Sequence, residues 1–261
     1  MNPLRRTGGG SLGPAWGSWI KLSSVESTEI MAKAGFDFCV VDLEHTLMDL
    51  NAVLAHIAVG QGRGMRMLVR VPDLRPSLIQ RLLDAGADGI VAPHVDDAET
   101  AARLVECTRF PPHGVRGSGG TSRAGGWGTA PRAEYLSRTG LAIGQIESVA
   151  AVRETGRIAT VDGLGALMLG PADLGIDAAS LRGAPPVAEL TATARAAAKA
   201  AGMLVGTAVG AGAIAKAAEE DYDFIVCGND TTTLAVGATG LIERTRRLAP
   251  RAATEHEEHL T

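Results

Sequence analysis

Short apolar runs that are rich in β-branched residues recur along the chain, and each is followed by a longer alanine-rich or amphipathic stretch. This alternation is typical of repeated β–α units around a parallel sheet. The apolar runs predict eight strands, at residues 18–21, 36–41, 67–71, 89–92, 141–146, 165–169, 203–207 and 224–227. The stretches between them predict helices, among them residues 24–34, 50–60, 76–85, 97–107, 187–201 and 211–219.

Eight alternating units favour a closed barrel over an open, doubly wound sheet, because no Gly-x-Gly-x-x-Gly turn follows the first predicted strand. The length of 261 residues also suits one such barrel. We therefore predict an α/β fold with a single domain, a (β/α)8 TIM barrel at residues 15–248, between flexible segments at 1–14 and 249–261. The Gly/Pro/Arg-rich connection at 111–130 is long enough to predict a functional loop rather than a linker.

Composition narrows the classes of function. The formal net charge is -4 and no basic stripe with interleaved aromatic residues occurs, so nucleic acid is not an expected partner. Cys39, Cys107 and Cys227 are odd in number, and two of them lie inside apolar runs as small hydrophobic residues, which predicts a reducing, cytoplasmic location. No leader-like or membrane-spanning apolar run is present, so we expect neither export nor membrane insertion.

Polar residues follow the predicted strands at the positions where a parallel barrel gathers its chemistry. After the second strand, Asp42 precedes His45 by three residues and can orient its imidazole as an acid/base group; the alternative is a turn cap beside a surface histidine. After the third strand, Arg70 can point at a carboxylate or an enolate oxygen, or form a structural salt bridge with Asp42 or Glu44. The sequence leaves both alternatives open.

Two further strands each end in a carboxylate. Glu147 follows the fifth strand and Asp173 follows the sixth, and two such acids suit a hard divalent cation that keeps water and substrate oxygens as its other ligands. A single Glu after a strand is more often a capping partner of the next helix N-terminus than a metal ligand. The turn at residues 170–173 can also seat a substrate carboxylate on its backbone N–H groups.

Lysine usage argues against one mechanism. A Schiff-base aldolase needs a desolvated lysine that projects from a strand into the barrel. The lysines are Lys21, Lys33, Lys199 and Lys216, and only Lys21 lies near a predicted strand end. Enolisation assisted by a metal ion is therefore better supported.

Seven short motifs occur in a fixed order. They are Gly17-Ser18-Trp19, Asp42 to His45, Arg70 before Pro72, Leu83-Asp84-Ala85-Gly86, Pro112 to Gly117, Gln145 to Glu147, and Gly170 to Leu174. In this order they resemble the HpcH/HpaI family of class II, metal-dependent pyruvate aldolases, which cleave substrates of the 4-hydroxy-2-oxoheptanedioate and 2-keto-3-deoxy sugar acid type. The resemblance covers about residues 17–248 and implies a barrel of the phosphoenolpyruvate/pyruvate type.

The resemblance implies how the reaction proceeds. Glu147 and Asp173 bind a divalent ion, Mg2+, Mn2+ or Co2+, without an organic cofactor, and the ion also holds the carboxylate and keto oxygens of pyruvate. Arg70 helps to stabilise the enolate oxygen. His45, oriented by Asp42, moves the proton.

The same resemblance implies binding roles and an assembly. The backbone N–H groups of Ala172 and Asp173 seat the pyruvate carboxylate, and Trp19 and Gln145 shape the pocket. Asp84 reaches the aldehyde end of a neighbouring subunit's site. The implied assembly is a homo-oligomer, a hexamer built as a trimer of dimers.

These implications predict a lyase that reversibly cleaves a 2-keto-4-hydroxy acid to pyruvate and an aldehyde, which makes a small keto acid and an aldehyde its expected partners. One alternative is a relative that acts on oxaloacetate, by decarboxylation or by condensation, because the same site stabilises the same intermediate. Another alternative is a barrel that has lost catalysis and only binds a keto acid. Retention of His45, Arg70 and both carboxylates disfavours the last alternative.

Overall fold

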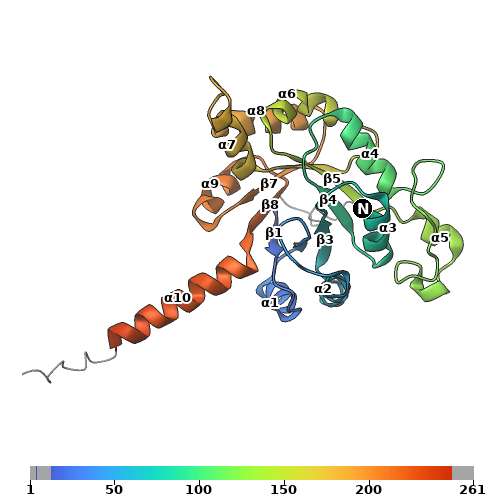
Figure 1. Ribbon diagram of the computed structural model, residues 1–261, viewed down its shortest axis with the longest axis horizontal. Coiled ribbons are helices and arrows are strands. Elements are labelled where there is room, and N and C mark those ends of the chain that lie inside the picture. Colours follow the sequence, from blue (N-terminus) through green and yellow to red (C-terminus); the bar gives the residue numbers. More distant parts are fainter. Residues whose placement is uncertain (1–3, 5–12, 249–261) are drawn as a thin grey trace, which may run out of the picture.

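The computed structural model describes Leu4 and residues 13–248. Parallel strands close into a barrel in which each strand pairs with the next and β8 pairs with β1 (Figure 1). The strands are β1 (Ala15–Ile20), β2 (Phe38–Asp42), β3 (Arg66–Arg70), β4 (Gly89–Ala92), β5 (Leu141–Ile146), β6 (Ala166–Leu169), β7 (Val205–Val209) and β8 (Phe224–Asn229). Each predicted strand overlaps one of these, and the prediction of a single closed barrel is confirmed.

Helices connect the strands and surround most of the barrel (Figure 1). They are α1 (Glu26–Ala34), α2 (Leu50–Gly62), α3 (Pro76–Asp84), α4 (Ala98–Thr108), α5 (Arg132–Ser137), α6 (Val149–Ile158), α7 (Pro171–Ser180), α8 (Val187–Ala200), α9 (Ile214–Glu219) and α10 (Asp230–Leu248), with short 3-10 turns η1 (Gly126–Gly128) and η2 (Ala211–Ala213). All of the helices predicted by residue range are present, and the last of them divides into η2 and α9.

The inside of the barrel is filled by every second side chain of the strands. The interior cluster includes Trp19, Phe38, Val40, Leu68 and Phe224, all of which are buried. The rings of Phe38 and Phe224 meet edge to face with their centroids 6.1 Å apart. A Cβ atom at Gly17 would overlap the ring of Phe38, so the glycine that opens the first motif makes room for this aromatic pair.

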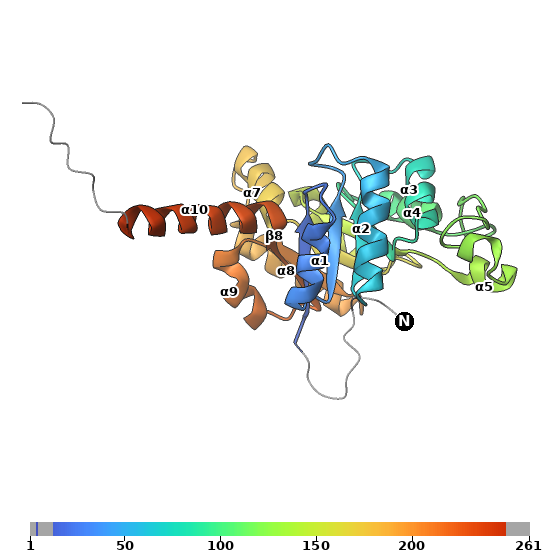
Figure 2. The ribbon, with the colours of Figure 1, turned by 90° about the horizontal axis from the view of Figure 1, so that it is seen from below.

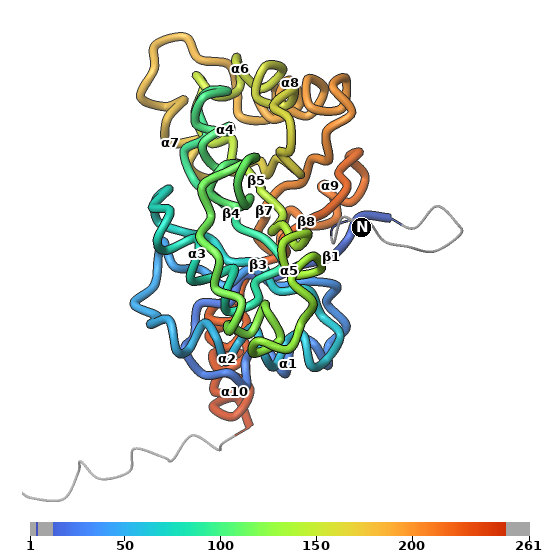
Figure 3. Tube along the Cα trace, turned by 90° about the vertical axis from the view of Figure 1, so that its right-hand side faces the viewer, coloured from blue at the N-terminus to red at the C-terminus, as the bar shows by residue number. Residues whose placement is uncertain are grey.

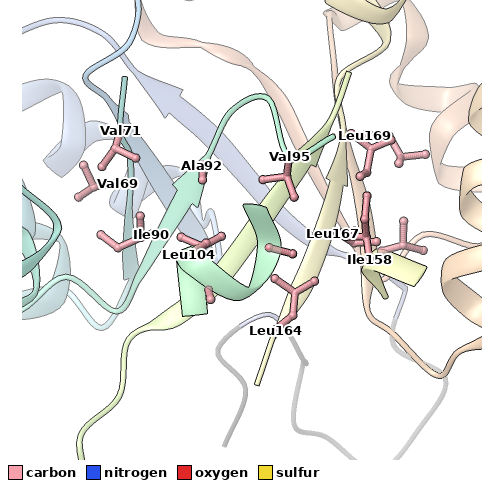
Figure 4. Close-up of a cluster of buried hydrophobic side chains, with 14 of the residues drawn as sticks. Val69, Val71, Ile90, Ala92, Val95, Leu104, Ile158, Leu164, Leu167 and Leu169 are labelled. Carbon is pink, nitrogen blue, oxygen red and sulfur yellow. The ribbon is translucent and has the colours of Figure 1, made fainter. Parts of the chain in front are cut away.

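The alternate side chains point outward and pack under the helices. Figure 4 shows Val69 and Ile90 on neighbouring strands, with Leu104 of α4 in the same cluster, and Leu167 of β6 near Ile158 of α6. All of these side chains are fully buried. The two buried layers follow from the period of two along a strand, which places consecutive residues on opposite faces.

Helix α10 departs from the ring of helices and extends away from the barrel (Figures 1 and 2). Its main contacts with the barrel are to β1 and β8, and among its described residues only Asp230 is buried. The Asp230 carboxylate accepts the backbone N–H groups of Lys21 and Leu22 at 2.9 and 3.0 Å, which fixes the start of α10 to the end of β1. Large apolar side chains remain exposed along the helix, at Leu234, Val236, Leu241, Ile242 and Leu248.

The predictions for the chain ends and for the long connection fare differently. The segments predicted to be flexible, 1–14 and 249–261, lie mostly outside the described residues, so that prediction stays untested, although Leu4 itself is buried in the interior cluster. The connection between α4 and β5, which contains residues 111–130, lies beside α3 on the outside of the barrel and carries η1 and α5 (Figures 1 and 3).

Cys39 and Cys107 are buried, Cys227 is partly buried, and all three thiols are free. Among the helices in the described part of the chain, none combines the length and the apolar character needed to cross a membrane.

Candidate active site

The carboxyl ends of the strands meet on one face of the barrel, and buried polar side chains gather there. Asp42 and Arg70 are the last residues of β2 and β3 and are partners in the strand register. Because alternate residues share a face, Asp42 continues the inward series of Phe38 and Val40, and Arg70 continues that of Leu68. Both polar side chains therefore point into the barrel mouth, where they are almost completely buried.

The guanidinium of Arg70 joins two carboxylates. Its Nε and Nη2 atoms donate to Oδ1 and Oδ2 of Asp42 at 2.9 and 2.7 Å, and its Nη1 atom lies 2.9 Å from Oε2 of Glu44. The ammonium of Lys21 also pairs with Asp42. The Arg70 guanidinium carbon lies 4.2 Å from the centroid of the Trp19 ring. The salt bridges that the sequence left open are thus formed, and they hold the arginine in one orientation.

The structure brings Asp42 to the backbone of His45 and not to its ring. The Asp42 carboxylate accepts the backbone N–H groups of Glu44 and His45 at 3.1 and 3.3 Å, and its oxygens also accept hydrogen bonds from Arg70 and Lys21. The His45 side chain is 57% exposed, and its Nε2 atom lies 3.8 Å from Oε2 of Glu44. The predicted hydrogen bond between Asp42 and the imidazole is therefore not formed, and the ring lies near Glu44 instead.

The charges around Asp42 change its acidity. Burial acts to raise the pKa of Asp42, but hydrogen bonds and charge from Arg70, and then from Lys21, outweigh burial and lower the pKa to about 2. The carboxylate is consequently ionised over the whole neutral and mildly acidic range.

Acid unfolding tests this ion pair. The folded pKa lies below the unfolded value of about 3.9, so ionised Asp42 stabilises the fold fully above about pH 4 and loses this effect as the pH falls towards 2. We expect Asp42→Asn to lower the free energy of unfolding by about 2 to 3 kcal/mol at pH 7 and by clearly less at pH 3, as measured by urea denaturation. Asp162→Asn, at a fully exposed carboxylate, is the control. A loss that does not change with pH would contradict the assignment.

Glu147 is the buried carboxylate of the site. Its side chain is 3% exposed, its Oε1 atom accepts the backbone N–H of His94 at 2.8 Å, and its Oε2 atom accepts the side-chain amide of Gln145 at 3.3 Å. Burial raises the pKa of Glu147; the His94 N–H and ring oppose this effect, and the charges of Glu44 and Asp173 add to it. Negative charge is thus concentrated around Glu147.

Asp173 enters the same opening from the first turn of α7. Gly170 precedes this helix, and a Cβ atom there would lie 3.1 Å from Cβ of Glu147, so the glycine lets the turn approach Glu147 closely. Asp173 is exposed, and its charge contributes to the raised pKa of Glu147, which puts the two carboxylates within electrostatic range. The N–H groups of Ala172 and Asp173 belong to the first turn of a helix, where no intrahelical acceptor is available and an anion can bind.

The residues of this opening fit a divalent cation, although they do not form a complete cage. Within Leu4 and residues 13–248, no group of three or more His, Cys, Asp or Glu side chains is placed to hold a metal ion. Glu147 and Asp173 nevertheless supply two hard oxygen ligands, and the buried Oε1 atom of Gln145 has no hydrogen-bond partner among the described residues. The concentrated negative charge and the unpaired Oε1 atom of Gln145 both suit a bound cation.

Comparison with protein-family models matches residues 16–236 to the model described as HpcH/HpaI aldolase/citrate lyase. The chain belongs to the HpcH/HpaI aldolase/citrate lyase family. The match includes all of the strands and every residue of the site described above.

Relatives within the HpcH/HpaI family support this placement. The 4-hydroxy-2-oxovalerate aldolase of Rhodococcus jostii (strain RHA1) is 40% identical over 162 residues, which are 60% of this chain and 62% of the relative. The 5-keto-4-deoxy-D-glucarate aldolase of Klebsiella pneumoniae subsp. pneumoniae is 36% identical over 161 residues, with the same coverage of 60% and 62%. The matched region therefore spans less than two thirds of either relative.

A solved structure extends the similarity to nearly the whole chain. The HpcH/HpaI aldolase/citrate lyase family protein from Burkholderia cenocepacia J2315 superposes with a TM-score of 0.83 at 33% identity. The alignment covers 90% of this chain and 95% of that chain. The barrel fold is consequently shared with another member of the HpcH/HpaI family.

Asp84 is the one candidate residue that lies away from the barrel mouth. It ends α3, which runs back to the amino ends of the strands, and its Oδ1 atom accepts a hydrogen bond from Nη2 of Arg116 at 2.9 Å. The role inferred for this residue in a neighbouring HpcH/HpaI subunit stays a prediction.

Sequence reasoning does not identify Glu44 or His94 as members of the site. His94 follows β4, and its Nδ1 atom lies 2.9 Å from Oε1 of Glu147. Its φ of 53° is uncommon for a residue other than glycine. The rule that polar residues follow strands also applies to His94 and would have found it. Lys21, considered only as a Schiff-base candidate, pairs with Asp42.

Proposed function

We propose that this chain is a carbon–carbon lyase, an aldolase that reversibly cleaves a 2-keto-4-hydroxy acid to pyruvate and an aldehyde. The observation that carries the proposal is the convergence of Glu147, the first turn of α7 with Asp173, and the braced guanidinium of Arg70 on one barrel mouth. The two curated relatives are named as aldolases of 4-hydroxy-2-oxovalerate and 5-keto-4-deoxy-D-glucarate, which supports a keto acid as substrate.

The proposal includes a divalent cation, Mg2+, Mn2+ or Co2+, held by the carboxylates of Glu147 and Asp173, and no organic cofactor. When bound, such a cation withdraws electron density from a keto acid and acidifies the protons next to its carbonyl. Gln145 and the His94 N–H position the Glu147 carboxylate. The N–H groups of Ala172 and Asp173 receive the substrate carboxylate.

Arg70 and His45 supply the remaining functions. Arg70 is held by Asp42 and Glu44 and stacked on Trp19, so its positive charge is preorganised for the keto oxygen as that atom becomes negative. The exposed imidazole of His45, beside Glu44, exchanges a proton between water and substrate. Trp19 also limits the width of the pocket.

A second candidate is action on oxaloacetate, by decarboxylation or by condensation with an acceptor, because the family description joins aldolases with citrate lyases. A steady-state comparison separates the two candidates. We expect the protein with Mn2+ to condense pyruvate with glycolaldehyde faster than it decarboxylates oxaloacetate. Turnover of oxaloacetate alone would instead favour the second candidate, and turnover of neither would favour a barrel that only binds a keto acid.

We propose further that the protein is a homo-oligomer, a hexamer built as a trimer of dimers, in which Asp84 serves a neighbouring site. The exposed apolar residues of α10 support this assembly, because a projecting helix gains by burying them against a second copy. We expect light scattering to give a multiple of 26.9 kDa. Leu241→Glu should lower that mass, while Thr232→Glu, at another exposed position of α10, should not. A monomeric wild type would refute the assembly.

A further inference from the structure

A second cavity, of about 760 Å³, lies at the opposite end of the barrel from the carboxylate site. Its wall includes Arg66 at the start of β3, Leu141 at the start of β5, and residues of the connection between α4 and β5. That connection lies beside α3 (Figure 1). Its charged lining residues are Arg66, Asp88, Arg109, Arg116, Arg123 and Arg138. Five cations thus face one carboxylate.

Arg109, Arg123 and Arg138 keep much of their charge available for a ligand, whereas Arg66 and Arg116 have close carboxylate partners. Asp88 lies 3.2 Å from Nη1 of Arg66, but the described contacts of the Arg123 guanidinium are to neutral oxygens. Within the described part of the chain, the ion pair of Arg109 is a long contact of 3.5 Å with a fully exposed carboxylate. Arg138 pairs with a half-exposed glutamate. Solvent screens the last two pairs, so neither consumes the charge of its arginine.

The backbone is shaped to receive two of these guanidinium groups. Gly86 has a φ of 95°, and a Cβ atom there would overlap Nη1 of Arg123. Gly163 has a φ of 85°, and a Cβ atom there would overlap the guanidinium of Arg109. The positive φ favours glycine at both places, and both guanidinium groups lie directly against it. Both guanidinium groups therefore lie close to the backbone of the cavity wall, and Arg123 is held there by hydrogen bonds to Gln61 and Ala85.

Arg116 adds a fixed guanidinium to the same wall, and Asp84 balances its charge through a contact of 2.9 Å. Its side chain is 2% exposed and lies over the ring of Phe110, with the guanidinium carbon 4.5 Å from the ring centroid. Its Nε atom is buried and has no hydrogen-bond partner among the described residues. The guanidinium is thus held with a donor unsatisfied next to the cavity.

Trp127 provides a different kind of surface at the rim. Its side chain is 70% exposed although tryptophan is among the largest apolar residues, and it lines the cavity. Its φ of 58° is in the left-handed region, and the glycines on both sides also have positive φ. A strained turn therefore presents a flat indole to the cavity, and an indole face suits a planar ring.

We propose that this cavity binds a nucleotide, a small organic phosphate that carries a planar ring. The phosphate oxygens would accept hydrogen bonds from Arg109, Arg123 and Arg138, because a guanidinium matches the geometry of phosphate oxygens. The ring would stack on Trp127. The volume lies in the range of small-molecule sites. This binding function goes beyond the proposed aldolase activity and does not depend on it.

Calorimetric titration of the full chain, without divalent cations, tests the proposal with ADP, pyrophosphate and adenosine as probes. We expect ADP to bind more tightly than either fragment and less tightly as NaCl is raised. Arg123→Gln and Arg138→Gln should each weaken ADP binding at least about tenfold. Trp127→Ala should weaken ADP but not pyrophosphate. Arg153→Gln removes the same charge from an exposed position of α6 and should change nothing.

Two results would overturn the site. One is the absence of ADP binding at about 1 mM ligand. The other is equal ADP affinity in the wild type and in the Arg123 and Arg138 variants. Thermal unfolding checks that each variant is folded, and the half-exposed Arg138 gives an informative variant even if the Arg123 variant does not fold. Glu147→Gln should keep ADP binding, so failure of this proposal and failure of the proposed aldolase activity are separate outcomes.

Discussion

Glu147→Gln is expected to lower kcat/KM for aldol cleavage by at least about 1,000-fold and to remove the stabilisation of the fold by Mn2+. The substitution keeps the size of the side chain and its capacity to accept the His94 N–H, but it removes one of two anionic ligands. Activity assays and thermal unfolding with and without Mn2+ measure both effects. Glu154→Gln, a partly exposed glutamate of α6, is the matched control.

The same variant should behave differently when no cation is present. Burial raises the pKa of Glu147, and the charges of Glu44 and Asp173 raise it further, so the ionised form destabilises the folded state at neutral pH. We therefore expect Glu147→Gln to raise the melting temperature of the cation-free protein by a few degrees, roughly 2 to 4 °C. Asp173→Asn, at an exposed position, should abolish the response to Mn2+ without this gain. Full turnover or an undiminished Mn2+ response in either variant would contradict the assigned ligands.

Arg70→Ala is expected to lower turnover by at least about 100-fold and the free energy of unfolding by about 3 to 5 kcal/mol, while Mn2+ still binds. The loss of stability follows because Asp42 and Glu44 would stay at the barrel mouth without the guanidinium that joins them. Urea denaturation, steady-state assays and the Mn2+-dependent shift in melting temperature separate the three effects.

Arg70→Lys distinguishes catalysis from support of the fold. Lysine restores one positive charge but cannot bridge two carboxylates in a planar fork. We expect this variant to recover part of the lost stability and little of the lost turnover. Arg153→Lys, at an exposed position, is the control. A folded Arg70 variant with normal turnover would show that the arginine serves the fold alone.

The barrel and the position of its active face could be predicted from the sequence because both depend on local patterns. Eight apolar runs define the strands, and in a closed parallel barrel the residues that follow them must meet on one face. That rule placed Arg70, Glu147 and Asp173 at one opening. The path of α10 could not be predicted, because the same amphipathic pattern allows a helix to pack on its own barrel or on a second copy.

The hydrogen bonds and ion pairs within the site could not be predicted, because they depend on contacts that spacing along the chain does not specify. Asp42 lies three residues before His45, but its carboxylate is taken by Arg70, which is 28 residues away and beside it only through the strand register. The prediction that Asp42 holds the imidazole ignored this competition. The strand-end rule marks His94 as a candidate because it follows β4, but its contact with Glu147 requires a positive φ, which sequence patterns do not indicate for histidine.

The most direct test of keto-acid enolisation at the barrel mouth follows the methyl protons of pyruvate by NMR in D2O. With Mn2+ present, the protein should replace these protons by deuterium in the absence of any aldehyde, and a chelator or Glu147→Gln should stop the exchange. A folded, Mn2+-saturated protein that leaves the methyl protons untouched would contradict the claim that this barrel mouth enolises a keto acid.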